Sequence, residues 1–337
     1  MKAARVGLDA RLTRQLSVGM KTYARELVAR LPRVAPEFTF VPFARGGNFG
    51  WDEQVRLPLA IARSRVELVH FLSQYVPAVV PARFIVTIHD LIHLHFPAHF
   101  KSKVRPYYET FVRWTCARAA RVITDDERTV EDLVCFLGTR RSKIRVVPLG
   151  VGEAFFRAVA PHVAPRPYVL YVGNHRRHKD LATLFTAWSA LPPGLKVDLY
   201  VTGPDDFGGE LERRSDPTRA IVALGEIHSD ELASYYAGAR ALVHPSLREG
   251  FGLPMLEAMA AGCPVLACED SLPRVLDSAA LSFKARDVDG LRTLLEQMLT
   301  DQGTRERSVN LGREAAGRLS WDRCARATAD VYREVLE

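Results

Sequence analysis

The chain has 337 residues, of which 47% are apolar and 25% are charged, a composition typical of folded globular proteins. No apolar run approaches the ~20 residues of a membrane-spanning helix, and the N-terminus lacks a signal-peptide pattern. The five cysteines are odd in number and form no Cys-x-x-Cys pair, which argues against a disulfide framework and a structural zinc. We therefore expect a cytoplasmic protein with two domains of roughly 150 residues each.

The charge is distributed unevenly along the chain. Residues 1–150 contain 24 Lys and Arg against 13 Asp and Glu, whereas residues 151–337 contain 22 against 26. A basic first half indicates an anionic partner. Because no nucleic-acid-binding motif accompanies the basic residues, we expect no nucleic acid but a phosphorylated acceptor or an anionic membrane surface, with the protein peripheral on the inner face of the membrane. A basic face that serves solubility alone is the alternative.

Short apolar strands alternate with helical stretches, a pattern typical of parallel sheets covered by helices. The predicted strands are residues 5–9, 38–43, 66–71, 84–89, 121–124 and 144–149, then 168–172, 197–202, 220–224, 241–244, 265–268 and 281–283. This order predicts an α/β protein with two doubly wound, Rossmann-like domains and a ligand in the cleft between them, at the carboxyl ends of the strands. We expect the domains at residues 1–157 and 168–318, a Pro-rich linker at 158–167 and a final helix within 319–337.

Gly19 lies between the first predicted strand and a helix that ends near Leu31. A glycine at such a turn lets the backbone approach a phosphate or sugar closely, and Lys21 adds a positive charge beside it. Further on, a buried strand beginning at Phe84 ends on His89 and Asp90. The carboxyl end of a parallel strand is where ligand chemistry is placed, so His89 is a candidate site residue, with a role in capping the next segment as the alternative.

No pattern of metal ligands is evident. His93, His95 and His99 follow one another without conventional ligand spacing. Asp287 and Asp289 have the Asp-x-Asp spacing of some metal sites, but they stand directly before a predicted helix, which favours helix capping. We therefore expect no metal.

A basic loop follows the first strand of the second half. Gly173 ends that strand, Asp180 begins a helix, and the loop between them carries Arg176, Arg177 and Lys179. A cluster of cations at the carboxyl end of a strand suits a diphosphate leaving group. A solvated basic turn is the alternative.

The stretch from Leu247 to Gly262 combines a glycine-containing loop with a short helix that begins near Pro254. Three backbone N–H groups at the helix start would favour an anion, those of Phe251, Gly252 and Leu253. Glu257, one turn inside the helix, suits a bidentate acceptor for a vicinal diol such as a ribose, and Glu249 faces the loop side. Together these features predict a nucleotide diphosphate site, whereas a capped helix with two solvated glutamates is the alternative.

This stretch resembles the signature of the retaining glycosyltransferases of family 4. The family pattern is Pro-Ser, two residues, Glu-Gly-Phe-Gly-Leu-Pro, then Glu-Ala-Met and Gly-x-Pro-Val, and each piece occurs at matching spacing from Pro245 to Val265. The helix start around Tyr23 resembles the family's first glycine loop, with Lys21 in place of its second glycine. Thr87-Ile-His-Asp-Leu91 resembles the mannosyltransferase-like members. The resemblance is densest from Gly173 to Val265 and weakest between residues 44 and 65.

The resemblance implies the GT-B architecture, in which two Rossmann-like domains face a cleft and the C-terminal helix crosses back to the first domain. It implies retaining, metal-independent transfer of a sugar, without a further cofactor, from a nucleotide-sugar donor to a glycan or lipid-linked acceptor. GDP-mannose is favoured by the similarity around His89. A nucleotide-sugar 2-epimerase and a non-catalytic glycan-assembly protein of the same fold are the alternatives.

The resemblance also assigns roles to individual residues. Lys179 with either Arg176 or Arg177 would face the donor diphosphate, and the backbone near Ile227 would meet the nucleobase. His89 would contact the donor sugar, and Gly19 belongs to the donor-binding glycine loop. The remaining donor-binding or catalytic residues are Gly173, Glu249, Phe251, Gly252, Leu253 and Glu257.

Overall fold

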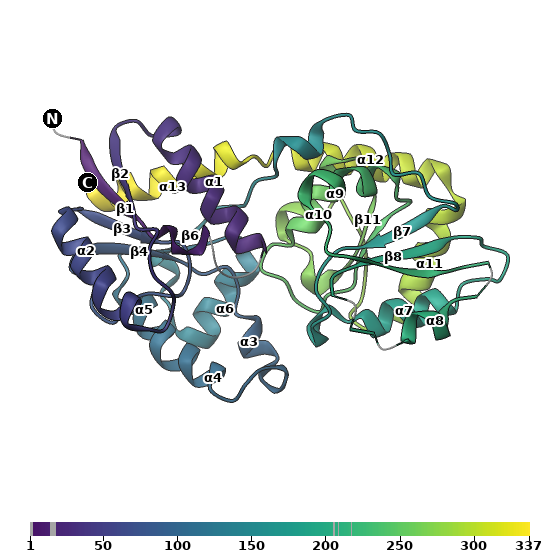
Figure 1. Ribbon diagram of the computed structural model, residues 1–337, viewed down its shortest axis with the longest axis horizontal. Helices are drawn as coiled ribbons and strands as arrows, with labels where there is room; N and C mark the ends of the chain where they lie inside the picture. The colour runs from purple at the N-terminus through teal and green to yellow at the C-terminus, as the bar shows by residue number, and fades with distance from the viewer. Residues whose placement is uncertain (1–2, 14–17, 205, 208, 217) are drawn as a thin grey trace. The chain divides into compact units, whose positions relative to one another are not determined.

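The computed structural model describes residues 3–13, 18–204, 206–207, 209–216 and 218–337. The chain divides into two compact units, of which the first contains residues 1–150 and 319–337 and the second contains residues 151–318. Each unit is built on one six-stranded sheet with helices packed around it (Figure 1). The predicted α/β class with two doubly wound sheets is confirmed. Among the described helices, none is both long enough and apolar enough to cross a membrane.

The first sheet has the strand order β2-β1-β3-β4-β5-β6, and its strands pair in parallel. The central strands are covered on both faces, so that all of β3 and all of β4 after Arg83 are buried without the alternation of a half-exposed strand. All six lie where the sequence predicts strands. Their bounds are β1 Ala4–Leu8, β2 Phe38–Pro42, β3 Leu68–Phe71, β4 Arg83–Thr87, β5 Arg121–Thr124 and β6 Ile144–Val146.

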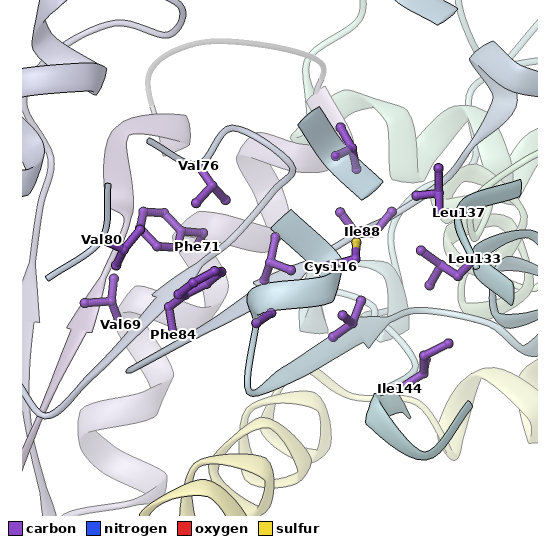
Figure 2. Packing of buried hydrophobic residues seen from close by; sticks show 14 of the residues in the cluster. Val69, Phe71, Val76, Val80, Phe84, Ile88, Cys116, Leu133, Leu137 and Ile144 are labelled. Carbon is purple, nitrogen blue, oxygen red and sulfur yellow. The ribbon is translucent and has the colours of Figure 1, made fainter. Parts of the chain in front are cut away.

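The core of the first unit lies between this sheet and its helices. Figure 2 shows Phe71 of β3 and Phe84 of β4 packed in a cluster that also takes in Cys116, Leu133 and Leu137 from two helices. Such apolar burial is the main favourable term that holds the sheet in place.

Six α-helices come before residue 150 in the described part of the first unit. They are α1 Val18–Val34, α2 Leu57–Ser64, α3 Ile92–His95, α4 Val104–Tyr107, α5 Arg113–Arg118 and α6 Glu127–Leu137.

The second sheet has the order β12-β11-β10-β7-β8-β9, again with parallel pairing. Chain order runs outward in both directions from β7 and β10, which lie side by side at the centre. The strand order therefore reverses between β7 and β10. The loops that follow two such strands diverge, and open α/β sheets bind ligands in the crevice between those loops. The bounds are β7 Tyr168–Tyr171, β8 Asp198–Thr202, β9 Ile221–Gly225, β10 Leu242–His244, β11 Val265–Cys268 and β12 Leu281–Phe283.

Helices surround the second sheet as well. Asp287 caps one of them by accepting a hydrogen bond from the backbone N–H of Gly290 at 2.9 Å, as its position before a helix predicts. The Pro-rich segment packs on this unit, because the His162 ring stacks on Tyr235 with centroids 4.1 Å apart. The helices are α7 Leu181–Ser189, α8 Glu210–Arg214, α9 Ser229–Gly238, α10 Leu253–Ala260, α11 Val288–Thr300 and α12 Gln302–Gly317.

Helix α13, Trp321–Leu336, leaves the second unit and packs against α1 of the first, so the predicted return of the chain end is confirmed (Figure 1). Asp322 accepts hydrogen bonds from Arg30 and Arg33 of α1. The buried hydroxyl of Tyr332 lies 2.7 Å from Nδ1 of His70 in β3. These contacts fix the last helix to both the sheet and its covering helix.

One local prediction needs correction. The sequence places Gly19 in a loop before a helix that starts after Tyr23, but α1 begins at Val18. Gly19 and Lys21 therefore lie in the first turn of the helix, because nothing after Val18 breaks helical structure before Pro32. Leu16 and Ser17, the start of the predicted loop, lie outside the described residues.

Gly150 lies directly against the start of α13. A methyl group on its Cα would come within 2.1 Å of the backbone nitrogen of Trp321, an atom that cannot move without shifting the helix. We predict that Gly150→Ala destabilises the fold by roughly 1–3 kcal/mol, measured as a lower Tm. Gly194→Ala is the matched control, because no heavy atom lies within 4 Å of its added methyl. An equal Tm for both variants would show that α13 does not depend on this close approach.

Candidate active site

The loops that follow β7 and β10 meet at the centre of the second sheet. The first contains Gly173 and the short helical turn η7, Arg177–Lys179, and the second runs from Pro245 to α10. A backbone hydrogen bond from the N–H of Leu247 to the carbonyl of His178, 2.8 Å long, joins the two loops. The site is therefore anchored by main-chain as well as side-chain contacts.

Lys179 and Glu249 form a salt bridge between these loops. The Lys179 Nζ lies 2.5 Å from Oε1 of Glu249, and the same oxygen lies 2.9 Å from Nε2 of His244 at the end of β10. The three side chains are 13%, 10% and 2% exposed, so the charges lie largely out of water. Burial alone would raise the pKa of Glu249, but the Lys179 ammonium and His244 hold it well below its usual range. Glu249 is thus a carboxylate, not an acid.

The ammonium group of Lys179 retains donors for a ligand. A lysine ammonium has three N–H donors, and the bond to Glu249 uses one of them. Beside it, the side chains of Arg176 and Arg177 are both exposed, so both guanidinium groups are open to solvent. The site therefore places up to three cations at the carboxyl end of β7.

Gly173 continues β7 into the basic loop with a φ of +154°, a conformation that glycine adopts most readily. Its N–H donates to Oγ1 of Thr202 at 3.1 Å, and its carbonyl lies 2.6 Å from where a Cβ on Gly203 would stand. The backbones that follow β7 and β8 thus approach each other too closely for side chains. A side chain at Gly203 would therefore collide with the loop that follows β7.

The start of α10 presents backbone donors. Gly252 precedes the helix with a φ of +76°, and a methyl at this position would lie 2.2 Å from Cε of Met255. Among the hydrogen bonds between described residues, none is donated by the N–H groups of Phe251, Gly252 or Leu253. Free donors and the helix dipole favour an anion at such a place.

Glu257 lies one turn into α10 and is half-buried. It accepts a hydrogen bond of 3.3 Å from the hydroxyl of Tyr236, and burial raises its pKa to about 7. Among the described residues, no cation comparable to Lys179 offsets that burial. Ile227, half-buried, lies between Gly225 at the end of β9 and the start of α9.

The two predicted site residues of the first unit lie on separate elements. Gly19 is in the first turn of α1, and His89 follows β4. Nδ1 of His89 lies 2.6 Å from Oδ2 of Asp125, and its Nε2 lies 3.2 Å from the carbonyl oxygen of Leu72. Although burial lowers the pKa of His89, Asp125 outweighs that effect and raises it. Asp125 and the carbonyl oxygen of Leu72 thus favour the protonated ring, although burial also raises the pKa of Asp125.

Two residues of these clusters are absent from the sequence prediction. His244 ends a strand and precedes Glu249 by five residues, and Asp125 directly follows β5. Polar residues at the carboxyl ends of strands drew attention to His89, and the same rule would have found both. Within the described chain, no group of three His, Cys, Asp or Glu side chains is placed to hold a metal ion.

Two protein-family models match this chain. The family model described as Glycosyltransferase Family 4 matches residues 18–155. The family model described as Glycosyl transferases group 1 matches residues 166–301. O-antigen chain mannosyltransferase B of Escherichia coli is 28% identical over 268 residues, which are 74% of this chain and 70% of that protein. Serotype-specific mannosyltransferase WbdA of Escherichia coli is 25% identical over 320 residues, 84% of this chain, but the match spans only 39% of that protein.

Two solved structures share the fold over nearly the whole chain. Sucrose-phosphate synthase from Thermosynechococcus elongatus has a TM-score of 0.80 at 20% identity and covers 99% of both chains. HepE of Anabaena, in complex with UDP-glucose, has a TM-score of 0.71 at 15% identity and covers 98% of this chain and 99% of its own. At these identities the likeness concerns the fold, and it confirms the GT-B architecture predicted from the sequence.

His244 provides a test of how Glu249 is held. We predict that His244→Leu lowers the free energy of unfolding by roughly 1–3 kcal/mol, because the buried carboxylate loses a hydrogen-bond donor. His244→Gln places an amide donor near the position of Nε2 and should recover most of that loss. Denaturant unfolding at neutral pH measures both. Equal destabilisation by the two substitutions would mean that the ring's packing, and not its hydrogen bond, is what matters.

Proposed function

Because the chain belongs to the glycosyltransferases of group 1 and family 4, we propose that it moves a sugar from a nucleotide diphosphate to an acceptor hydroxyl, with retention at the anomeric carbon. The observation that carries this proposal is the Lys179–Glu249 pair, which fixes an ammonium group where the strand order of the second sheet reverses. The donor diphosphate would accept hydrogen bonds from that ammonium group.

The barrier is the breaking of the bond between the anomeric carbon and the phosphate oxygen. As that bond lengthens, negative charge grows on the leaving diphosphate, and Lys179, Arg176 or Arg177, and the N–H groups of residues 251–253 would stabilise it. Preorganised donors of this kind contribute roughly 3–4 kcal/mol each to the transition state. The protein's own cations would take the part that a divalent metal plays in other enzymes.

No protein nucleophile is required in this scheme. A diphosphate oxygen would accept the acceptor proton on the same face of the sugar, so the new bond forms where the old one breaks. Glu249 is a weak base, because Lys179 and His244 depress its pKa. Its role would be to position Lys179 and to meet a sugar hydroxyl or the developing positive charge. An inverted anomeric configuration in the product, observed by NMR, would overturn this scheme.

The other contacts follow from the resemblance together with the geometry. Glu257 would accept hydrogen bonds from the ribose hydroxyls, and the backbone near Ile227 would meet the base. His89, oriented by Asp125, would contact the donor sugar, and Gly19 belongs to the same proposed donor-binding set. GDP-mannose is the donor we propose, supported by the mannosyltransferase relatives and by Thr87-Ile-His-Asp-Leu91.

We propose a glycan or lipid-linked glycan of cell-surface polysaccharide assembly as the acceptor, supported by the O-antigen relative. Binding to the membrane's inner face would bring the enzyme to such an acceptor. The segment from Lys101 to Arg118 supplies a basic surface with a half-exposed aromatic side chain. The guanidinium of Arg118 lies 4.4 Å above the ring of Trp114, which is 39% exposed. A cation beside an exposed aromatic ring suits the interface of an anionic bilayer.

A thermal-shift panel of nucleoside diphosphates tests the proposed function. A ligand at 100 times its dissociation constant adds about 2.7 kcal/mol of stability, so GDP should raise Tm more than UDP or ADP. Sugar transfer and the GDP shift should both persist in excess chelator. The proposal fails if no nucleotide raises Tm, and metal independence fails if chelator abolishes turnover. Epimerised nucleotide sugar released without acceptor would instead identify a 2-epimerase.

The basic segment predicts salt-sensitive membrane binding. Binding to vesicles that contain anionic lipid should fall steeply as ionic strength rises past ~0.15 M, where the Debye length is about 8 Å. Sedimentation with vesicles measures this binding. Equal binding to neutral and anionic vesicles at low salt would leave the positive charge as a solubility feature.

Lys179→Ala should lower kcat roughly 100-fold or more, because the lost ammonium faces charge that grows in the transition state. Steady-state kinetics at saturating donor measure the effect. Since the substitution also leaves Glu249 buried without its cation, circular dichroism must show that the variant is folded. Full kcat in a folded variant would place the diphosphate elsewhere.

Glu257 predicts a pH dependence of donor binding. The ribose hydroxyls would donate to a carboxylate, so binding favours the deprotonated form, and affinity should rise as pH increases through about 7. Glu257→Gln should raise the donor KM with little change in kcat and should remove this rise. Calorimetry with the intact nucleotide sugar avoids titration of a terminal phosphate. A variant that keeps the wild-type pH profile would exclude Glu257 as the diol acceptor.

A further inference from the structure

The loop between β2 and the helical turn η2, Asp52–Arg56, projects two aromatic side chains into solvent. Phe49 is 65% exposed and Trp51 is 69% exposed. The loop leaves β2 at the carboxyl edge of the first sheet, the edge where doubly wound domains bind ligands. It falls within residues 44–65, where the resemblance to family 4 is weakest.

The shape of this loop is fixed from below by a buried ionic cluster. The guanidinium of Arg11 pairs with Asp9 at 2.7 Å and with Glu53 at 3.2 Å, and these side chains are 1–2% exposed. Arg11 also donates to the carbonyl of Gly47, and Glu53 accepts from the backbone N–H of Phe49. The rings are therefore presented by a rigid support.

The conformation of Phe49 has a cost that packing does not explain. Its φ of +62° lies in the left-handed region, which bulky L-residues rarely adopt. Its ring touches Tyr75 and Tyr107 edge-on, at centroid distances of 5.0 and 5.4 Å, yet most of its surface remains in water. Strain of this kind clusters at active sites, ligand clamps and switch regions, although Arg65 and Arg286 of this chain also have positive φ.

A pocket on this loop combines the Trp51 ring with polar side chains. Its volume is about 270 Å³, and its lining includes Trp51, Asn48, Asp52 and Arg56. Drug-sized ligands occupy about 300 Å³ or more, so this cavity suits a smaller unit such as one sugar ring. The face of an aromatic ring packs against the C–H groups of a sugar, while amide, carboxylate and guanidinium groups bond its hydroxyls.

We propose that residues 47–56 form a binding site for a saccharide unit of the acceptor glycan, with Trp51 as the stacking platform and Asn48, Asp52 and Arg56 as hydroxyl partners. This inference rests on the proposed function, which requires an acceptor. A bilayer interior is the less suitable occupant, because insertion would desolvate the Asp52–Arg56 ion pair, whose side chains are 39% and 73% exposed. Sugar hydroxyls would instead replace the water around that pair.

Ligand-observed saturation-transfer NMR on the full chain tests the site, with α-linked mannobiose, lactose and chitobiose as probes. We expect transfer to at least one disaccharide in the wild-type protein and a signal about tenfold weaker in Trp51→Ala, the loss that one aromatic contact can produce. Phe49→Gly suits the positive φ and removes the second ring, so it should fold and also weaken binding. Phe156→Ala, which removes a ring that is 44% exposed in the second unit, is the matched control and should leave the signal unchanged.

The shift in Tm with GDP serves as the readout of the donor site and should be the same in all four proteins. No transfer to any disaccharide, or an unchanged signal in Trp51→Ala, would overturn the saccharide site while the proposed function stands. Loss of vesicle binding in the two loop variants with sugar binding intact would also overturn it, in favour of a membrane surface. Absence of a GDP shift in the wild-type protein would remove the proposed function and this inference with it.

Discussion

The ion pair between Lys179 and Glu249 is the interaction on which the candidate active site depends. A buried charge is tolerated only when it is paired, and each of these side chains supplies the partner that the other requires. The two residues follow β7 and β10, so the pair ties together the two loops that diverge at the centre of the second sheet. By satisfying one N–H of the ammonium group, it fixes the direction of the other two. A flexible lysine thereby becomes a positioned cation, which is what stabilisation of a leaving diphosphate requires.

The first unit holds its charges in the same way. Arg11 is paired with Asp9 and Glu53, and His89 is held by Asp125 from the neighbouring strand's loop. Glu257 differs, because burial raises its pKa to about 7 and its described partner is a tyrosine hydroxyl. A carboxyl group in that state gains most from a ligand that brings its own donors. Among the described residues, Glu249 is paired with a cation and Glu257 only with a tyrosine hydroxyl, which separates the group that positions a lysine from the group that would bind a ribose.

Much of this arrangement could be predicted from the sequence. All twelve predicted strands are present. A β-branched apolar run between turn residues is a good sign of a strand, because it reflects both a local preference for extended backbone and burial within a sheet. The pairing of Glu249 with Lys179 and His244 could not be predicted, since it joins residues from two strands whose adjacency depends on the whole sheet order. The helical position of Gly19 was also missed, because a glycine between strand and helix predicts a loop. Phe49 at positive φ could not be predicted either, since bulky residues rarely adopt that conformation.

The central claim is that Glu249 acts on the donor diphosphate through Lys179. A double-mutant cycle tests it, with GDP dissociation constants measured by calorimetry for the wild-type protein, Lys179→Ala, Glu249→Gln and the double variant. If Glu249 works by positioning the lysine, its substitution should cost little once Lys179 is gone, and the coupling energy should lie between about 0.5 and 3 kcal/mol. The opposite result in folded variants is that the two single losses of binding free energy sum to the loss in the double variant within about 0.3 kcal/mol. That result, or full GDP affinity in Lys179→Ala, would contradict the account.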